Sequence, residues 1–117
     1  MDKLFRDHAI NIGIILSKEQ VVDPYEKNKE HVLLNPLPIK AIVTDLVFSQ
    51  IQWKMPGVIT DKAKELIIQK KKENLLLQSY RIKIGNEYYY GWKVNGRLQY
   101  RVEGNYIRVY VYIKKED

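Results

Sequence analysis

The chain contains no cysteine, only two histidines and no long apolar run among its 117 residues. The absence of cysteine excludes disulfide bonds, a thiol nucleophile and zinc sites built on cysteine, and it fits a reducing cytoplasm while leaving the compartment open. The longest apolar stretch, residues 12–16, is far shorter than the roughly 20 residues that cross a bilayer. Charged residues interrupt the first eight positions, unlike in a secretory signal. We therefore expect a small soluble domain with no membrane partner.

Motifs that would indicate catalysis are also lacking. His8 and His31 stand in different segments without the spacing of metal ligands, which favours surface or strand histidines. The sequence has no glycine-rich phosphate loop, no nucleophile elbow and no paired-carboxylate motif. We therefore expect no enzymatic activity, no cofactor and no metal site.

What the sequence does contain is an ordinary globular composition with an uneven distribution of charge. Hydrophobic residues make up 45% and charged residues 29%, and the length fits one domain spanning residues 1–117. The net charge is +6, yet residues 1–60 hold seven basic and seven acidic residues, so the whole excess lies after residue 60. Eight of the nine tyrosines lie there too. Any positive field therefore comes from the second half of the chain.

The first half reads as strands joined by turns. Alternating or β-branched residues predict strands at residues 9–16, 31–34 and 39–47, whereas residues 1–8 are expected to be a flexible N-terminus. Residues 23–28 (DPYEKN) are typical of a turn, because proline fixes φ and Asp and Asn bond their own backbone. The prolines at 36 and 38 cannot donate to a strand ladder, which favours a sheet edge or a crossover.

Residues 48–60 are interpreted as a projecting loop that displays Trp53 and Met55, with a tight turn at Pro56-Gly57. These large apolar side chains either fold back on the core or are exposed to a partner. The candidate partner or channel residues of this loop are Gln52, Trp53, Lys54, Met55 and Pro56. A helix over residues 61–73 follows, with Thr60 as its N-cap, and a longer helix to residue 78 is the alternative. The three lysines at 70–72 would be its solvated end.

Residues 79–113 predict a four-stranded antiparallel meander. We expect three-residue loops at 84–86 and 94–96 and a two-residue turn at 104–105, and together they place one set of side chains on a single apolar face. That set is Tyr80, Ile82, Tyr88, Tyr90, Trp92, Leu98, Tyr100, Val102, Ile107, Val109, Val111 and Ile113. The fold class is mostly β: a small antiparallel sandwich or barrel, SH3-like or roll, with one short helix and this C-terminal meander.

The opposite face of the meander collects basic and tyrosine side chains. The register turns Tyr89 and Tyr106 to this side, together with the candidate residues for an anionic partner: Arg81, Lys83, Lys93, Arg97, Arg101, Arg108, Tyr110 and Tyr112. It also places Arg97 opposite Tyr112 and Arg101 opposite Arg108, and facing like charges are mildly destabilising unless something neutralises them. Three interpretations stay open: an acidic protein partner, a nucleic acid held by phosphate and stacking contacts, or a solvated face on which Tyr and Arg pack together.

The order of these features resembles the head–tail joining proteins of tailed bacteriophages, in particular the head-closure or stopper group. The resemblance covers roughly residues 9–113 and is carried by the leading strand, residues 23–28, the stretch LNPLP at 34–38, the loop with its short helix, and RIKIGNEYY at 81–89. The short helix after the loop and the Tyr/Arg-rich meander depart from that family. They leave open a stopper, an adaptor or the first tail-side ring.

The resemblance implies a small β-barrel that forms a ring, expected to be dodecameric, in the neck of the virion after assembly in the host cytoplasm. Its partners would be other copies of itself, the portal or adaptor, the tail proteins and packaged DNA in the channel. Residues 48–59 would contact the channel or a neighbour and help retain the DNA. The alternative is a nucleic-acid-binding small β-barrel that acts through its Tyr/Arg face.

Overall fold

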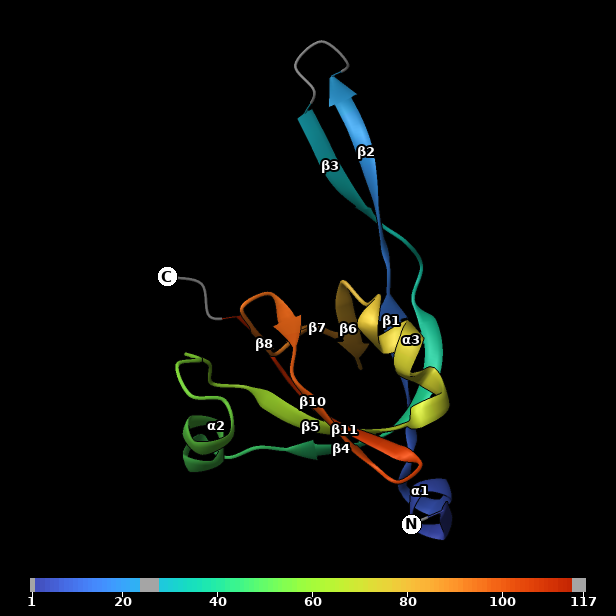
Figure 1. Cartoon of the computed structure of the whole chain (residues 1–117), viewed down its shortest axis with the longest axis vertical. Helices are drawn as coiled ribbons and strands as arrows, with labels where there is room; N and C mark the ends of the chain where they lie inside the picture. The colour runs from blue at the N-terminus through green and yellow to red at the C-terminus, as the bar shows by residue number, and fades with distance from the viewer. Residues whose placement is uncertain (1, 24–27, 115–117) are drawn as a thin grey trace.

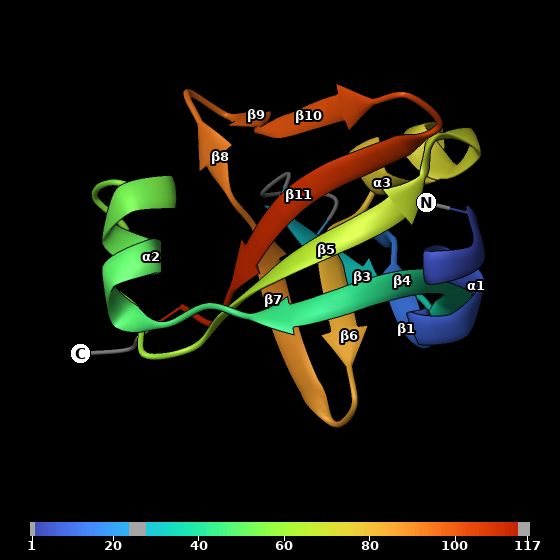
Figure 2. The same ribbon diagram turned by 90° about the horizontal axis from the view of Figure 1, so that it is seen from below.

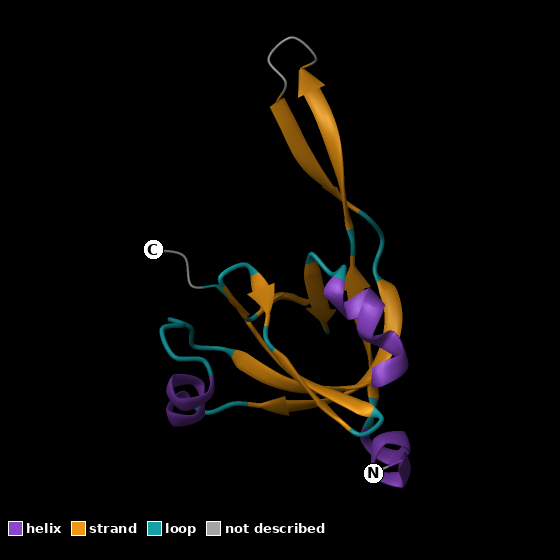
Figure 3. Cartoon of the chain, in the orientation of Figure 1, coloured by secondary structure: helices purple, strands orange, loops and turns teal. Residues whose placement is uncertain are grey.

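Six antiparallel strands close into a barrel in the computed structural model, which describes residues 2–23 and 28–114, the side chains of 18–33 excepted (Figures 1 and 3). In order around the barrel they are β11 (Tyr106–Tyr112), β5 (Ala63–Gln69), β4 (Leu37–Asp45), β1 (Ile10–Ile15), β6 (Arg81–Ile84) and β7 (Glu87–Gly91), which returns to β11. A mostly β fold with a small antiparallel barrel and a C-terminal strand meander is thus confirmed.

The remaining strands form additions to the barrel. β10 (Tyr100–Glu103) pairs with the first half of β11, and β7 pairs with its end. Between β7 and β10 the chain leaves the barrel and forms a short ribbon of β8 (Lys93–Val94) and β9 (Arg97–Leu98). A longer ribbon of β2 (Ser17–Asp23) and β3 (Asn28–Leu33) extends away from the barrel, and the molecule measures 54 × 31 × 26 Å (Figure 1). The predicted turn at 23–28 falls mainly on residues 24–27, outside the described residues.

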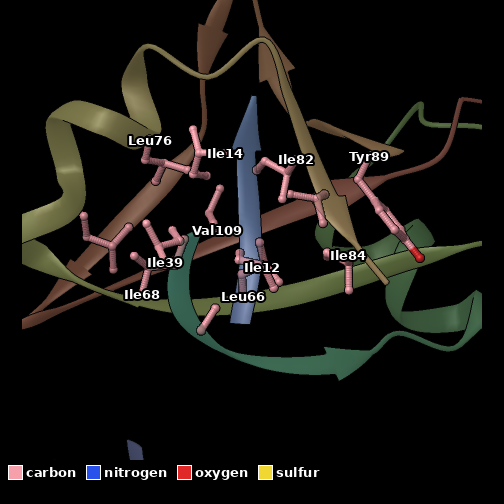
Figure 4. Close-up of a cluster of buried hydrophobic side chains, with 13 residues drawn as sticks. Ile12, Ile14, Ile39, Leu66, Ile68, Leu76, Ile82, Ile84, Tyr89 and Val109 are labelled. Atoms are coloured by element: carbon pink, nitrogen blue, oxygen red, sulfur yellow. The ribbon is translucent and has the colours of Figure 1, made fainter. Parts of the chain in front are cut away.

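The barrel interior is filled by alternate side chains of its strands, which is why the period-two pattern appears in the sequence. Ile12, Ile39, Leu66 and Val109 are among the buried side chains that meet there (Figure 4). Leu76, fully buried on α3 (Glu73–Leu77), extends this cluster beyond the strands. Complete burial of one such aliphatic side chain contributes roughly 1.5–3 kcal/mol.

A second, smaller cluster joins helix α2 (Phe48–Lys54) to the barrel. Ile51 and Met55 of this segment are buried against Leu46 and Ala63, and Tyr110 packs at the side. The projecting loop predicted for 48–60 is therefore wrong in its first half, because residues 48–54 form a helix. The apolar positions 51 and 55 are spaced by four, so both point to the same side of that helix.

The N-terminus is also ordered by packing. Residues 2–8 form helix α1 (Asp2–His8), where a flexible segment was expected. Phe5 is buried and its ring lies 5.3 Å from the ring of Tyr106. A helix of seven residues is marginal by itself, so contacts with the barrel stabilise it, among them this aromatic pair and a hydrogen bond from the Tyr106 hydroxyl to Asp2.

The helix predicted for 61–73 is wrong, because residues 63–69 form β5, which pairs with β4 and β11 along its length. Thr60 therefore caps no helix, and its hydroxyl group bonds to the backbone beside two strands. The hydroxyl oxygen accepts from the Lys62 N–H at 3.1 Å, just before β5, and the hydroxyl donates to the Ile113 carbonyl at 2.6 Å, just after β11. Helical structure begins only at η1 (Lys70–Lys72) and continues as α3. Pairing with two neighbouring strands overrides the local helix signals.

The predicted register of the meander is confirmed in one hairpin and wrong in two. The turn at Gly104-Asn105 pairs Arg101 with Arg108 and Val102 with Ile107 as expected. The other two turns have two residues where three were expected, since Ile84 pairs with Glu87 and Val94 with Arg97. Asn95 and Gly96 both have positive φ, the conformation of a two-residue hairpin turn.

This change of turn length moves every side chain of β7 to the other face. Tyr89 is fully buried although it was expected on the outside, whereas Tyr88 is half exposed. Tyr106, also expected outside, is buried beneath α1. Arg97 lies opposite Val94 and therefore does not face Tyr112.

Candidate functional site

A buried carboxylate organises the outer face of β5 and β11. Glu65 is only 8% exposed, and its two oxygens accept hydrogen bonds from two cations of distant segments. Arg108 Nη1 lies 2.6 Å from Oε1, and Lys54 Nζ lies 3.2 Å from Oε2. Lys54 also sits over the Tyr110 ring, 5.4 Å from its centroid. Glu65 thus ties the end of α2 to β11.

A second carboxylate resolves the repulsion expected between the facing arginines. Glu103 Oε2 lies 3.1 Å from Arg108 Nη2, and its other oxygen lies 3.2 Å from Arg101 Nε. The hydrogen bond from Arg108 holds the pKa of Glu103 below its ordinary value, and the charges of both arginines act in the same direction. Reciprocally, the hydrogen bond with Glu103 and the charge of Glu65 raise the pKa of Arg108. Both arginines thus have carboxylate partners within the chain, and the cluster of three cations and two carboxylates keeps one net positive charge.

Arg81 is engaged by aromatic rings. Its guanidinium carbon lies 4.1 Å from the Tyr80 ring centroid and 3.7 Å from that of Tyr90, and its Nη2 donates to the Tyr90 hydroxyl at 2.8 Å. The Tyr112 ring stacks on Tyr90 with 6.1 Å between centroids. Each cation–π contact at such a partly exposed site is worth about 0.5–1 kcal/mol. The interpretation in which Tyr and Arg pack on each other therefore describes this group.

The eight candidate residues for an anionic partner do not form one surface. Arg101, Arg108 and Tyr110 lie on the face that also carries Glu65 and Glu103. These three candidate residues and Trp92 line a hollow of about 160 Å³ where the β8–β9 ribbon leaves the barrel. The other five are divided among the aromatic stack (Arg81 and Tyr112), the β6–β7 hairpin (Lys83) and the β8–β9 ribbon (Lys93 and Arg97). Lys93 and Arg97 are exposed, and neither has an ion pair within residues 2–23 and 28–114.

The five candidate residues of the segment predicted as a loop lie at the end of α2 or directly after it, and they differ in burial. Met55 is fully buried and Lys54 is bound to Glu65, whereas Trp53 is 86% exposed and Gln52 and Pro56 are exposed as well. Met55 thus folds back on the core, as the first alternative expected, whereas Trp53 is exposed and a partner for it stays a prediction. Phe48, which belongs to the segment 48–59 but was not among its five candidate residues, is 71% exposed on the same helix.

Glu65 and Glu103 were also missed as members of the outer face. Glu65 was placed on a helix, where it could not belong to a sheet surface. Glu103 lies on the same side of β10 as Arg101, and this i, i+2 spacing of opposite charges was the signal that could have identified it.

Within the part of the chain that the structure describes, no three acidic, histidine or cysteine residues gather in a way that could hold a metal ion. None of the helices described is long and apolar enough to cross a membrane. Comparison of the chain with family models, with curated proteins and with solved structures found no match.

Proposed function

We propose that the chain is a structural component of a phage neck: it forms a ring that joins the portal or adaptor to the tail and helps to retain packaged DNA. This role is non-enzymatic and acts through contacts between proteins. The proposal rests on the order of sequence features, which resembles that of head–tail joining proteins.

The observation that supports this proposal best is the β2–β3 ribbon, which extends from the barrel and accounts for much of the 54 Å length (Figure 1). A two-stranded hairpin without a third strand or a covering helix is only marginally stable in water. Its pairing runs from Ser17 with Leu33 to Asp23 with Asn28, well outside the barrel. Such an element is suited to contact a neighbouring subunit or a channel, the role first assigned to residues 48–59.

The carboxylate partners of Arg101 and Arg108 also favour protein contacts over nucleic acid. A nucleic acid is bound mainly by cations of the protein that pair with its phosphates and so release the counterions condensed on it. Arg108 and Arg101 already pair with carboxylates of this chain. A nucleic acid would have to compete with Glu103 and Glu65 for them.

The test is co-assembly with portal and adaptor proteins of the phage genome to which the proposal assigns this chain. The wild-type protein should form a high-order oligomer or bind the portal–adaptor complex in sedimentation and electron microscopy, with modest dependence on salt. A variant in which a short Gly-Asn turn replaces residues 18–32 should keep the circular dichroism of the barrel and lose this assembly. A protein that remains small and does not bind the complex would contradict the proposal.

The alternative, a nucleic-acid-binding barrel, is favoured by the exposed cations Lys93 and Arg97 on one ribbon. It predicts tight binding of a labelled oligonucleotide by the monomer, with affinity that falls steeply as salt rises. Arg97→Ala together with Arg101→Ala should then abolish binding, while Lys3→Ala with Lys40→Ala, which removes two exposed charges elsewhere, should weaken it only slightly. That pattern would displace the phage-neck proposal.

A further inference from the structure

One end of the barrel carries an exposed apolar surface, which we call the α2 knob. It consists of Val47, Phe48, Trp53 and Ile59, which are 61%, 71%, 86% and 76% exposed. No other large apolar side chain in the described part of the chain is more than half exposed. Their exposed apolar areas add up to on the order of 500 Å², and large exposed apolar side chains gathered in one segment are typical of a binding site.

The knob carries almost no charge. Lys54 is the one charged residue in the segment 47–59, and Glu65 already binds its ammonium group. An occupant of this surface therefore needs apolar contact area and groups that recognise an aromatic face, and gains little from acidic side chains.

The opposite end of the barrel contains a pocket with an aromatic wall and a charged rim, which we call the α1 pocket. Its volume is about 380 Å³, and it lies between α1 and the strands β4, β5 and β11. The aromatic contact of Phe5 with Tyr106 forms one wall, and Ala9 lines it as well. The remaining lining residues are Asp2, Arg6, Lys40 and Gln69. Asp2 already accepts a hydrogen bond from the Tyr106 hydroxyl.

The two surfaces lie on opposite sides of the barrel, with α2 on one side and α1 on the other (Figures 1 and 2). Arg6 and Lys40 could each be placed over an inserted indole, the strongest aromatic acceptor for a cation. We propose that Trp53 of one copy of this chain inserts into the α1 pocket of the next copy. This inference rests on the proposed function, since it names the contact by which copies join.

A contact between two different surfaces is heterologous, so that it repeats from copy to copy and produces a closed ring or an open filament. A contact of one knob with another knob would be isologous and would stop at a dimer. The two arrangements therefore respond differently when one surface is destroyed at a time.

The experiment uses sedimentation velocity on the full chain over a range of concentrations. Trp53→Ala destroys the knob at an exposed position, and Ala9→Trp fills the pocket. Each should weaken self-association at least tenfold, while Leu77→Ala, which truncates a half-exposed leucine on α3, should leave it unchanged. If Ala9→Trp fails to fold by circular dichroism, Arg6→Glu with Lys40→Glu tests the pocket instead.

Mixing the two defective variants is the decisive measurement. One retains an intact pocket and the other an intact knob, so an equimolar mixture should form a one-to-one dimer that cannot grow. A wild-type dimer that is lost in Trp53→Ala and kept in Ala9→Trp would instead show knob-to-knob packing and overturn the proposal. A wild-type chain that stays monomeric at all concentrations would overturn it too. So would Trp53-dependent binding to phosphatidylcholine–phosphatidylglycerol vesicles without self-association.

The outcome is separable from that of the proposed function. If the wild-type chain co-assembles with the portal and adaptor while both variants assemble equally well, the contact is wrong and the neck role stands. If the variants behave as expected and the wild-type oligomer does not bind the portal–adaptor complex, the contact between Trp53 and the α1 pocket is right and the neck role is wrong.

Discussion

Removing the hydroxyl group of Tyr89 should stabilise this protein. The side chain is fully buried on β7, at the opposite side of the barrel cluster from Leu76 (Figure 4), and its hydroxyl has no hydrogen-bond partner among the described residues. An unsatisfied buried hydroxyl costs about 1–3 kcal/mol, and the small void left by the oxygen atom offsets part of the gain. Tyr89→Phe should therefore raise the free energy of unfolding by about 1 kcal/mol.

Urea unfolding followed by tryptophan fluorescence measures this change. For a chain of this length we also expect the midpoint of thermal unfolding to rise by about 3–5 °C. Tyr88→Phe is the matched control, since it removes the same atom from the neighbouring residue of the same strand at a half-exposed position. That variant should stay within about 0.5 kcal/mol of wild type.

The pH dependence of stability provides an independent check on the same residue. Burial, and after it the negative charges of Glu87 and Asp45, raise the pKa of Tyr89 to about 12 from the model-compound value of 10. The unfolded chain then releases this proton more readily than the folded one, so stability present below pH 10 is lost as the pH rises toward 12. Tyr89→Phe should lack this part of the alkaline loss, whereas Tyr88→Phe should retain it.

A result in which Tyr89→Phe lowers the free energy of unfolding by 1 kcal/mol or more would refute the reasoning. It would mean that the hydroxyl makes a favourable hydrogen bond in the folded protein. The register of β7, which places Tyr89 inside, would remain testable by Tyr89→Ala, whose cost should be about 3–5 kcal/mol.

Two further substitutions test the packing of the barrel. Glu65→Gln should lower the free energy of unfolding by about 2 kcal/mol in urea titrations, below the 3–5 kcal/mol of a fully buried pair, because Arg108 and Lys54 stay partly exposed; a loss under 0.5 kcal/mol would show that the network contributes little. Gly13→Ala should cost about 1–3 kcal/mol, because the added carbon would lie 2.7 Å from Pro36 Cβ. Pro36→Gly in the same chain should recover much of that loss in thermal unfolding, and a purely additive double variant would contradict the clash.

The strands whose side chains face one core were predictable from the sequence. Residues 10–15, 39–45 and 106–112 alternate or are rich in β-branched residues, and the structure contains β1, β4 and β11 there. The hairpin at Gly104-Asn105 was predicted with its register, because a two-residue turn leaves one pairing consistent with the apolar face.

The wrong predictions concern segments whose local sequence pattern fits two structures equally well. Residues 63–69 combine apolar side chains at both helical and strand spacings, and only hydrogen bonding to β4 and β11 selects a strand. The turn at 84–87 could hold two or three residues between its strands. That single choice decides whether Tyr88 or Tyr89 is buried.

The sequence by itself determined a mostly β domain whose positive charge and tyrosines lie after residue 60, since both follow from composition and period. Only the tertiary structure decided what those charges do. Glu65 pairs with Arg108, 43 positions away, and with Lys54, 11 positions away, and Glu103 bridges the two facing arginines. Ion pairs between distant segments depend on strand pairing, which no local pattern encodes. The structure therefore pairs Arg101 and Arg108 with carboxylates, leaves Lys93 and Arg97 exposed, and leaves the apolar knob on α2 exposed as well.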